Sequence, residues 1–198
     1  MKKIILVLFF NLIFINISKA QSNYPNCKGN DVSKWSSCYS EYTFPKDYNF
    51  KKFGKYKKNF SGDLKNTYQG EWLNGLPHGK GRFYYANGFE YSGGFQQGLI
   101  SGKGLMKFSK HKSYNGDWLD SEFDGLGTII SYENNNKVEI QSYFKSGKYS
   151  DLCYKKDFYF MCKITIQDQS GNKTTAFFNE LKKDDSVAKK TLQKIIGK

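Results

Sequence analysis

The sequence predicts an all-β protein, an elongated single-layer antiparallel sheet of stacked β-hairpins with a short C-terminal helix. The main observation is a unit of 23 residues that recurs from Tyr68, Tyr91 and Tyr114. Aromatic residues and glycines alternate within each unit, which is the period of a β-strand. A single hairpin is marginally stable in water, so each unit must pack against its neighbours in an extended sheet.

The first strand of each unit is predicted from this alternation. Tyr68, Gly70 and Trp72 occupy alternate positions and therefore share one face of a strand. A glycine between two rings leaves room for a large ring from a neighbouring strand to lie over the backbone, so these residues indicate packing. The same pattern recurs at Tyr91, Gly93 and Phe95, and at Tyr114, Gly116 and Trp118.

A second strand follows a turn marked by Gly75 in the first unit and Gly98 in the second. Its buried face is predicted from apolar residues 23 positions apart, and the opposite face is mostly polar. A further turn that tolerates positive φ is expected before the next unit. The apolar positions are Phe83, Met106 and Ile129, the opposite positions are Lys80, Lys103 and Leu126, and the turn positions are Gly88, His111 and Asn134.

The pattern Tyr-x-Gly-x-Trp-x-x-Gly-x-x-His-Gly-x-Gly, which begins at Tyr68, resembles the MORN repeat. The resemblance covers three repeats, at 68–90, 91–113 and 114–136. Later repeats depart from it, since Ser101 and Asp124 replace His78, and Ser121 replaces the turn glycine. The resemblance implies a scaffold, a protein-binding platform or a membrane-associated module, with any chemistry in a separate domain.

The flanking segments are predicted to cap the sheet. Residues 21–67 contain an N-terminal cap around Trp35–Phe44 and a basic aromatic segment. Residues 137–172 are expected to hold a degenerate fourth repeat and capping strands, one of them over 157–166. Residues 173–198 are predicted to form a basic amphipathic helix, because Phe177, Phe178 and Leu181 lie three to four positions apart.

The N-terminal residues 1–20 have the pattern of a cleavable signal peptide. Two lysines precede an apolar stretch, and small residues stand at Ser18 and Ala20, so cleavage is expected near Ala20. An uncleaved anchor helix is the alternative, although Asn11 and Asn16 interrupt the stretch. We therefore expect a periplasmic or secreted protein.

Four cysteines in an exported chain are expected to form disulfides. Three pairings are possible, and the sequential one, Cys27 with Cys38 and Cys153 with Cys162, is favoured because each pair closes a short loop beside a capping element. A zinc site is the rival interpretation, but spacings of eleven and nine residues fit no common ligand pattern.

The formal charge of +13 becomes +10 after the predicted signal peptide, with its three lysines, is removed. The excess either keeps an aromatic-rich protein soluble or attracts it to an anionic surface such as lipid headgroups. Export argues against nucleic acid as the partner. The predicted anionic-surface contacts are Lys51, Lys52, Lys55, Lys57, Lys58, Lys189, Lys190 and Lys194.

No constellation of catalytic residues is visible. The chain has two histidines, of which His78 belongs to the repeat pattern and His111 occupies a turn position. Glu71 and Asp117 are equivalent positions two units apart, so the repeat separates them, and no phosphate-binding glycine loop is present. We expect no catalytic residue, cofactor, metal or small-molecule substrate.

The first functional hypothesis is an exported scaffold that binds a protein partner. The rings of its aromatic face would either anchor the partner or serve only as the packing core of the sheet. Anchoring is considered because aromatic residues dominate the energetics of recognition. The second hypothesis is peripheral binding to an anionic membrane through the lysine clusters and the C-terminal helix. A small envelope hydrolase with an unfamiliar site is a third. The candidate aromatic residues are Tyr68, Trp72, Tyr91, Phe95, Tyr114 and Trp118.

Overall fold

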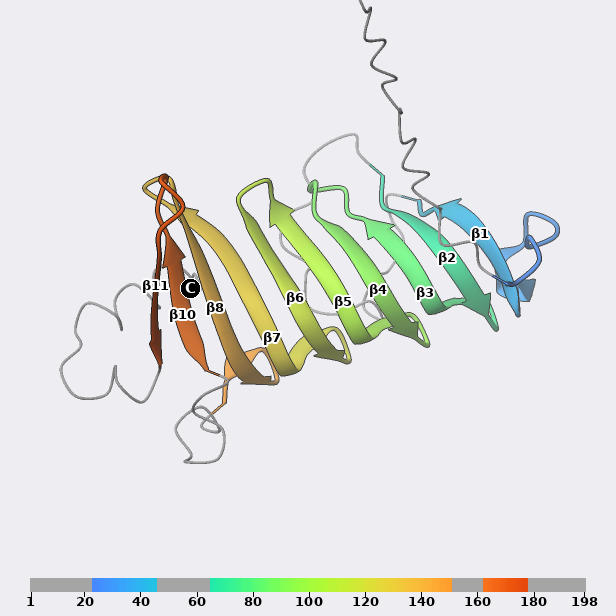
Figure 1. The fold of residues 1–198 in the computed structure, drawn as a ribbon. Helices are drawn as coiled ribbons and strands as arrows, with labels where there is room; N and C mark the ends of the chain where they lie inside the picture. The colour runs from blue at the N-terminus through green and yellow to red at the C-terminus, as the bar shows by residue number, and fades with distance from the viewer. Residues whose placement is uncertain (1–22, 46–64, 151–161, 178–198) are drawn as a thin grey trace, which may run out of the picture.

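A computed structural model describes residues 23–45, 65–150 and 162–177, which form one open antiparallel sheet (Figure 1). The strands follow one another across the sheet in chain order up to β8, then β10 and β11, while β9 pairs only with β8. They are β1 (Cys38–Thr43), β2 (Thr67–Leu73), β3 (Leu76–Tyr84), β4 (Glu90–Gln96), β5 (Leu99–Ser109), β6 (Lys112–Leu119), β7 (Glu122–Glu133), β8 (Asn136–Lys145), β9 (Lys148–Tyr149), β10 (Lys163–Gln167) and β11 (Lys173–Phe177).

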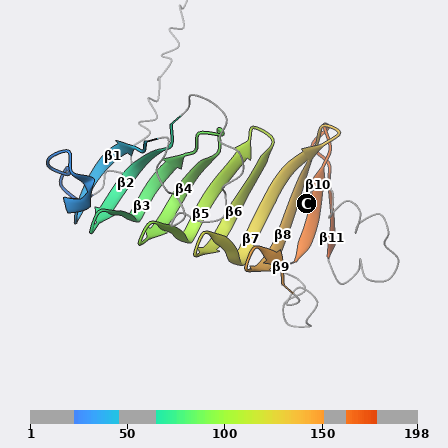
Figure 2. The ribbon, with the colours of Figure 1, turned by 180° about the vertical axis from the view of Figure 1, so that it is seen from behind.

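The single-layer sheet of stacked hairpins is the predicted architecture and is confirmed. Each 23-residue unit forms one hairpin, β2–β3, β4–β5 and β6–β7, and successive hairpins pair side by side. Viewed from behind, the strands form one long twisted layer (Figure 2). The short 3₁₀ helix η1 (Val32–Lys34) is the only helix among the described residues.

The turns within the hairpins adopt the left-handed conformation at both central residues. Asn74 and Gly75 have φ of 51° and 73°, and Gln97 and Gly98 have 50° and 81°. Two consecutive positive φ values are what a two-residue type I′ turn requires, and this turn matches the twist of the flanking strands. The equivalent pairs are Asp120 with Ser121, and Ser146 with Gly147.

The turns between hairpins agree with the sequence pattern at two of the three predicted positions. Gly88 and Asn134 adopt φ of 84° and 49°, as expected for a position that favours glycine or asparagine, whereas His111 does not adopt a positive φ. The β3–β4 turn is closed by the Gly88 amide, which donates to the Tyr85 carbonyl oxygen at 2.9 Å.

The core consists of aromatic rings that contact one another from repeat to repeat. Within a repeat, the Tyr68 and Trp72 ring centroids are 5.1 Å apart, and the next contact runs from Tyr68 to Phe95 at 4.9 Å. Tyr91 contacts Trp118 of the following repeat in the same way, at 5.4 Å. Most of these pairs are edge-to-face, the arrangement that aromatic rings favour.

Glycines make this packing possible. A Cβ placed on Gly70 would lie 2.5 Å from Cζ of Tyr68, and a Cβ on Gly81 would lie 2.6 Å from the same atom. The ring therefore covers a glycine of its own strand as well as one of the neighbouring strand, whereas the sequence pattern alone predicted only the neighbour. The rings of Tyr91 and Tyr114 cover glycine pairs in the same manner.

The N-terminal edge of the sheet is closed by a disulfide-linked segment. Cys27 and Cys38 form the predicted disulfide, with their Cα atoms 4.9 Å apart. The Tyr39 amide donates to the Pro25 carbonyl oxygen at 2.8 Å, so the segment before Cys27 covers part of the outer side of β1. Cys162 is also disulfide-bonded, and the remaining cysteine, Cys153, lies outside the described residues.

The C-terminal helix predicted over 173–198 is wrong where the structure describes it. Residues 173–177 form β11, paired with β10, and Thr165 and Thr175 hydroxyls lie 3.0 Å apart across the pair. A threonine pair suits a strand, and the three-to-four spacing of the apolar residues starts only where β11 ends. The strand predicted over 157–166 is observed in its second half as β10, while 178–198 and 151–161 lie outside the described residues.

Candidate interaction surfaces

The six aromatic residues predicted as partner anchors or core lie in the core. Their side chains are between 0 and 4% exposed, which leaves almost no ring surface for a partner to contact. These residues are Tyr68, Trp72, Tyr91, Phe95, Tyr114 and Trp118.

The tyrosine hydroxyls of the core bind backbone oxygens. Tyr68 Oη donates to the carbonyl oxygen of Glu71 at 2.9 Å, and Tyr114 Oη donates to that of Asp117 at the same distance. Burial raises the pKa of Tyr68 well above that of a free tyrosine, because the phenolate would lose its hydration. The hydroxyls therefore act as neutral donors that fix the backbone where the strand register shifts.

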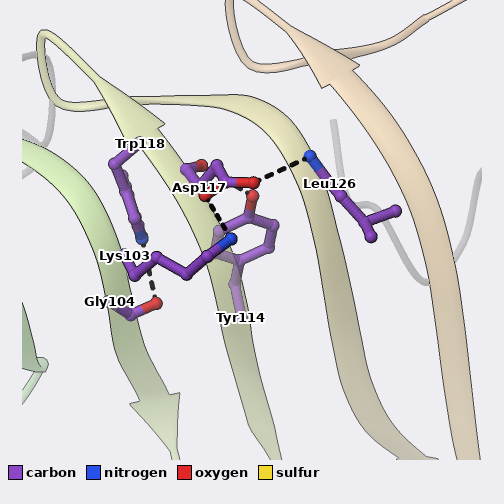
Figure 3. A network of polar contacts seen from close by, with 6 residues as sticks. All are labelled: Lys103, Gly104, Tyr114, Asp117, Trp118 and Leu126. Carbon is purple, nitrogen blue, oxygen red and sulfur yellow. Dashed lines mark hydrogen bonds and ion pairs between the residues drawn. The ribbon is translucent and has the colours of Figure 1, made fainter.

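The face of the sheet opposite the aromatic core is here called the open face. Carboxylates on this face accept hydrogen bonds at the same register shifts. The register of β6 and β7 shifts between Gly116 and Trp118, and Asp117 lies at the shift. Its Oδ2 accepts a hydrogen bond from the Leu126 amide at 3.2 Å, and its Oδ1 lies 2.6 Å from Lys103 Nζ (Figure 3). Glu71 accepts in the same way from the Lys80 amide at 3.2 Å.

These carboxylates have a structural role that the sequence analysis missed. Glu71 and Asp117 lie on β2 and β6 with three strands between them, so they are separated as the repeat predicts. The spacing of Glu71 and Asp117, two units of 23 residues, was the signal that could have revealed this structural role. The second repeat has Gly94 at the equivalent position, and a Cβ there would collide with the Ser101 carbonyl oxygen.

A second set of polar contacts joins the turn of one repeat to the preceding repeat. His78 Nδ1 accepts a hydrogen bond from the Gln97 amide at 3.4 Å, so this residue of the repeat pattern has a structural contact. Asp124 occupies the equivalent position, accepts from the Ser146 amide at 3.3 Å and pairs with Lys145 Nζ at 2.9 Å. The hydrogen bond from Lys145 lowers the pKa of Asp124, since it favours the carboxylate.

The backbone repeats this link at every turn. The Gly98 amide donates to the Pro77 carbonyl oxygen at 2.8 Å, and the Ser121 amide donates to that of Ile100 at 2.9 Å. Ser121 also accepts from the Ile100 amide at 3.0 Å through Oγ, so the serine that replaces the turn glycine gains a contact. Equivalent bonds run from Gly75 to Trp35 and from Gly147 to Phe123.

Two large apolar side chains of the repeats remain exposed, Leu119 at 48% and Tyr132 at 47%. Tyr132 lies on β7, on the opposite parity from buried Ile129 and Ser131, and therefore on the open face. Its ring centroid is 5.7 Å from that of His111 in the β5–β6 turn. The sequence analysis placed His111 in a turn but did not single out Tyr132, which is not part of the aromatic-glycine alternation.

The predicted anionic-surface lysines fall outside the described residues. Within residues 65–150 the charges nearly balance, with ten Lys or Arg and eight Asp or Glu, so the repeats themselves are not the source of the basic excess. Among the described residues, no helix is long and apolar enough to cross a bilayer.

Comparison with known protein families identifies the repeats. The MORN repeat family model matches residues 68–89, 91–112 and 114–135, in the register of the three hairpins. No curated protein matches the chain. The match and the hairpin geometry agree repeat by repeat, including the tyrosine over its glycine pair. Residues 68–135 are therefore three consecutive MORN repeats.

Proposed function

We propose that this protein is an exported, non-catalytic interaction scaffold of the cell envelope or extracellular space, and that it holds a protein partner at Tyr132 and His111. MORN repeats indicate a binding or scaffold role, through contact with proteins or membrane lipids. The partner-binding element is assigned to this pair because the six aromatic residues of the repeat pattern are buried.

The exposed Tyr132 ring is the observation that carries this proposal. Tyrosine is among the residues that contribute most to protein interfaces, because it offers a large rigid surface with one polar atom. His111 lies beside Tyr132, and Lys137 on β8 is the residue paired with Tyr132 in the sheet. The hairpins beneath are locked together by backbone and side-chain bonds, so the pair is presented on a rigid support.

Export is supported by the disulfide and by the predicted signal peptide. Cys27–Cys38 places a disulfide in the chain, and disulfides persist mainly in oxidising compartments. The predicted signal peptide at residues 1–20 lies outside the described residues. Localisation of the tagged chain, together with the N-terminal residue of the mature protein, tests this part of the proposal.

The binding site is tested by Tyr132→Ala, with Leu119→Ala as the matched control. Both side chains are about equally exposed and lie on the open face, so each change is expected to alter stability by only about 0.5 kcal/mol or less. A photo-reactive phenylalanine analogue at 132 should crosslink one protein from an envelope extract, and Tyr132→Ala should lose that protein in affinity capture. Equal capture by Tyr132→Ala and Leu119→Ala would refute the assignment.

Peripheral binding to anionic lipid is the second candidate function. It is favoured by the concentration of positive charge outside the balanced repeats, since the chain after residue 20 carries +10 and residues 65–150 carry +2. Flotation with anionic and neutral vesicles across a salt series tests it. Binding to anionic vesicles alone, lost at high salt, would support this function, and no flotation with either would exclude it.

A further inference from the structure

The two end strands of the sheet, β1 and β11, run in opposite directions (Figure 1). Nine pairings lead from β1 to β11, and every one of them is antiparallel. A second copy in the same orientation therefore brings its β1 antiparallel to β11 of the first copy. Among the described strands, β1 pairs only with β2, and β11 pairs only with β10. The outer edge of such a strand is a template for pairing with another chain.

The backbone of β11 points away from β10 at alternate residues. The Asp168 amide donates to the Asn172 carbonyl oxygen at 3.0 Å, so these two residues face each other across the β10–β11 hairpin. In an antiparallel pair, every second residue directs its backbone groups toward the partner strand. The backbone groups of Lys173, Thr175 and Phe177 therefore point outward.

The outer edge of β1 has the same arrangement. The Tyr39 amide donates to the Pro25 carbonyl oxygen at 2.8 Å, and the Tyr39 carbonyl oxygen accepts from the Cys27 amide at 3.0 Å. The backbone of Tyr39 thus points outward, and by the same alternation so do the backbones of Glu41 and Thr43. No hydrogen bond from a described segment outside the sheet reaches the backbone of Glu41 or Thr43.

The side chains of the two edges also lie on matching faces. On β1 the outward residues alternate with residues of the core face, since Cys38 and Phe44 are buried. On β11 they alternate with residues such as Ala176, which pairs with buried Ile164. Both sets of outward residues therefore have their side chains on the open face. Pairing of the two edges would continue the open face and the core face from one copy to the next.

The charges of the two end strands are complementary. Glu41 is the one charged residue of β1, and Lys173 is the one charged residue of β11. A register with Glu41 opposite Thr175 pairs all of β11 with residues 39–43. In that register Lys173 lies diagonally across from Glu41, within reach of a long side chain. Two copies of β1 paired with each other would instead bring their Glu41 carboxylates together.

A short segment already occupies part of the β1 edge. This edge segment, residues 25–27, bonds both backbone groups of Tyr39, and the disulfide from Cys27 to Cys38 holds it in place. It leaves Glu41 and Thr43 accessible but withdraws Tyr39 from pairing with another chain. We propose that β11 of one copy pairs with β1 of the next copy, head to tail, and that the edge segment restricts this pairing while it covers Tyr39.

This self-association goes beyond the proposed protein scaffold. Head-to-tail pairing is heterologous, because each copy uses one edge for the preceding copy and the other edge for the following copy. It therefore continues through further copies instead of closing as a dimer. Tyr132 and His111 lie on neither end strand, so the two kinds of binding are separable.

Sedimentation velocity over a concentration series tests the proposal. Cys27→Ala/Cys38→Ala, here called the unlinked variant, should form species that grow beyond a dimer at concentrations at which the oxidised chain remains a monomer. Thr175→Pro in the unlinked variant should weaken association about tenfold or more, because proline removes an outward amide that only the next copy would use. Thr175→Val keeps that amide and is the matched control, which should associate as the unlinked variant does.

Charge reversal tests the direction of pairing. In the unlinked variant, Glu41→Lys and Lys173→Glu should each weaken association about fivefold, because each places like charges diagonally across the new strand pair. Both changes together should restore association. A double reversal that stays as weak as the single ones would overturn head-to-tail pairing, since β1 paired with β1 keeps like charges together in every case.

Circular dichroism of each variant checks that the sheet is retained. If the unlinked variant loses the sheet, reduction of the unmodified chain by a phosphine supplies the same comparison with and without Thr175→Pro. A monomer, a closed dimer, or association that Thr175→Pro leaves unchanged would overturn the proposal. Equal association of the oxidised chain would overturn the role of the edge segment. Tyr132→Ala should associate fully, so loss of its protein capture concerns only the proposed function.

Discussion

Gly104 and Gly102 lie two residues apart on β5, and their replacement by alanine separates two uses of glycine. A Cβ on Gly104 would lie 2.5 Å from Cε2 of Tyr91 and still closer to its Cζ and Oη. Gly102 has open space around its missing Cβ but adopts φ of +77°. Gly104→Ala therefore causes a steric conflict with the core, whereas Gly102→Ala causes only backbone strain.

The expected costs differ. Tyr91 is 1% exposed, so a Cβ beneath it must push a fully buried ring out of place. Loss of burial for such a side chain costs about 1.5–3 kcal/mol, and overpacking costs about 1–3 kcal/mol, so we expect about 3 kcal/mol for Gly104→Ala. An alanine in the left-handed region costs about 1 kcal/mol, which is our expectation for Gly102→Ala.

Urea unfolding of the oxidised chain, followed by circular dichroism, measures the difference as a change in midpoint at constant slope. The decisive comparison repeats Gly104→Ala in a Tyr91→Ala background, where the ring is absent and the added methyl group should cost little. Equal losses for Gly102→Ala and Gly104→Ala, or an undiminished cost in the Tyr91→Ala background, would refute the account of a ring lying over glycine.

Three further predictions concern the polar contacts between and within repeats. Tyr114→Phe removes the donor to the Asp117 carbonyl oxygen and should cost about 1–3 kcal/mol in urea unfolding; an unchanged midpoint would show that the hydroxyl is not needed. Ser121→Ala loses the acceptor for the Ile100 amide and keeps a strained positive φ. Ser121→Gly also loses the acceptor but relieves the strain by about 1 kcal/mol, so it should be the more stable of the two variants. The reverse order of thermal midpoints would contradict this. Asp124 has a pKa lowered from 3.8, so its carboxylate stabilises the fold above that pH and the stabilisation is lost as pH falls through the lower folded pKa; Asp124→Asn should flatten the acid limb of the stability curve, and identical acid limbs would argue against the contact.

The arrangement of the hairpins could be predicted because one pattern specifies both strand faces and turns. Tyr68, Gly70 and Trp72 fix the side of the strand that faces the core, and the 23-residue interval fixes which strand follows. The turn at Asn74–Gly75 follows from the same interval. Periodicity is a local signal, and in this fold each unit contacts mainly its neighbours in sequence, so local signals determine the architecture.

Contacts that depend on exact atomic positions could not be predicted. The alternation does not reveal that a tyrosine ring lies along its own strand, nor that Glu71 reaches an amide of the next strand at a register shift. The strand β11 was mistaken for a helix because five residues offer too short a window to separate a period of 2 from one of 3.6. Tyr132 was overlooked because it lies outside the aromatic-glycine alternation and on the strand face opposite the buried residues.

The backbone hydrogen bonds between each hairpin turn and the previous hairpin determine how the number of repeats can change. Every turn from Gly75 to Gly147 donates to a carbonyl oxygen one unit back, so a whole unit can be added or removed while each remaining turn still finds its acceptor. Between the turns at Ser121 and Gly147 the interval is 26 residues instead of 23, and the three extra residues fall at the opposite end of the hairpins, between the paired residues Gly127 and Ser142. Growth by duplication is therefore compatible with this fold in steps of one hairpin, and smaller insertions are accommodated where they lengthen a hairpin without breaking the succession of turns.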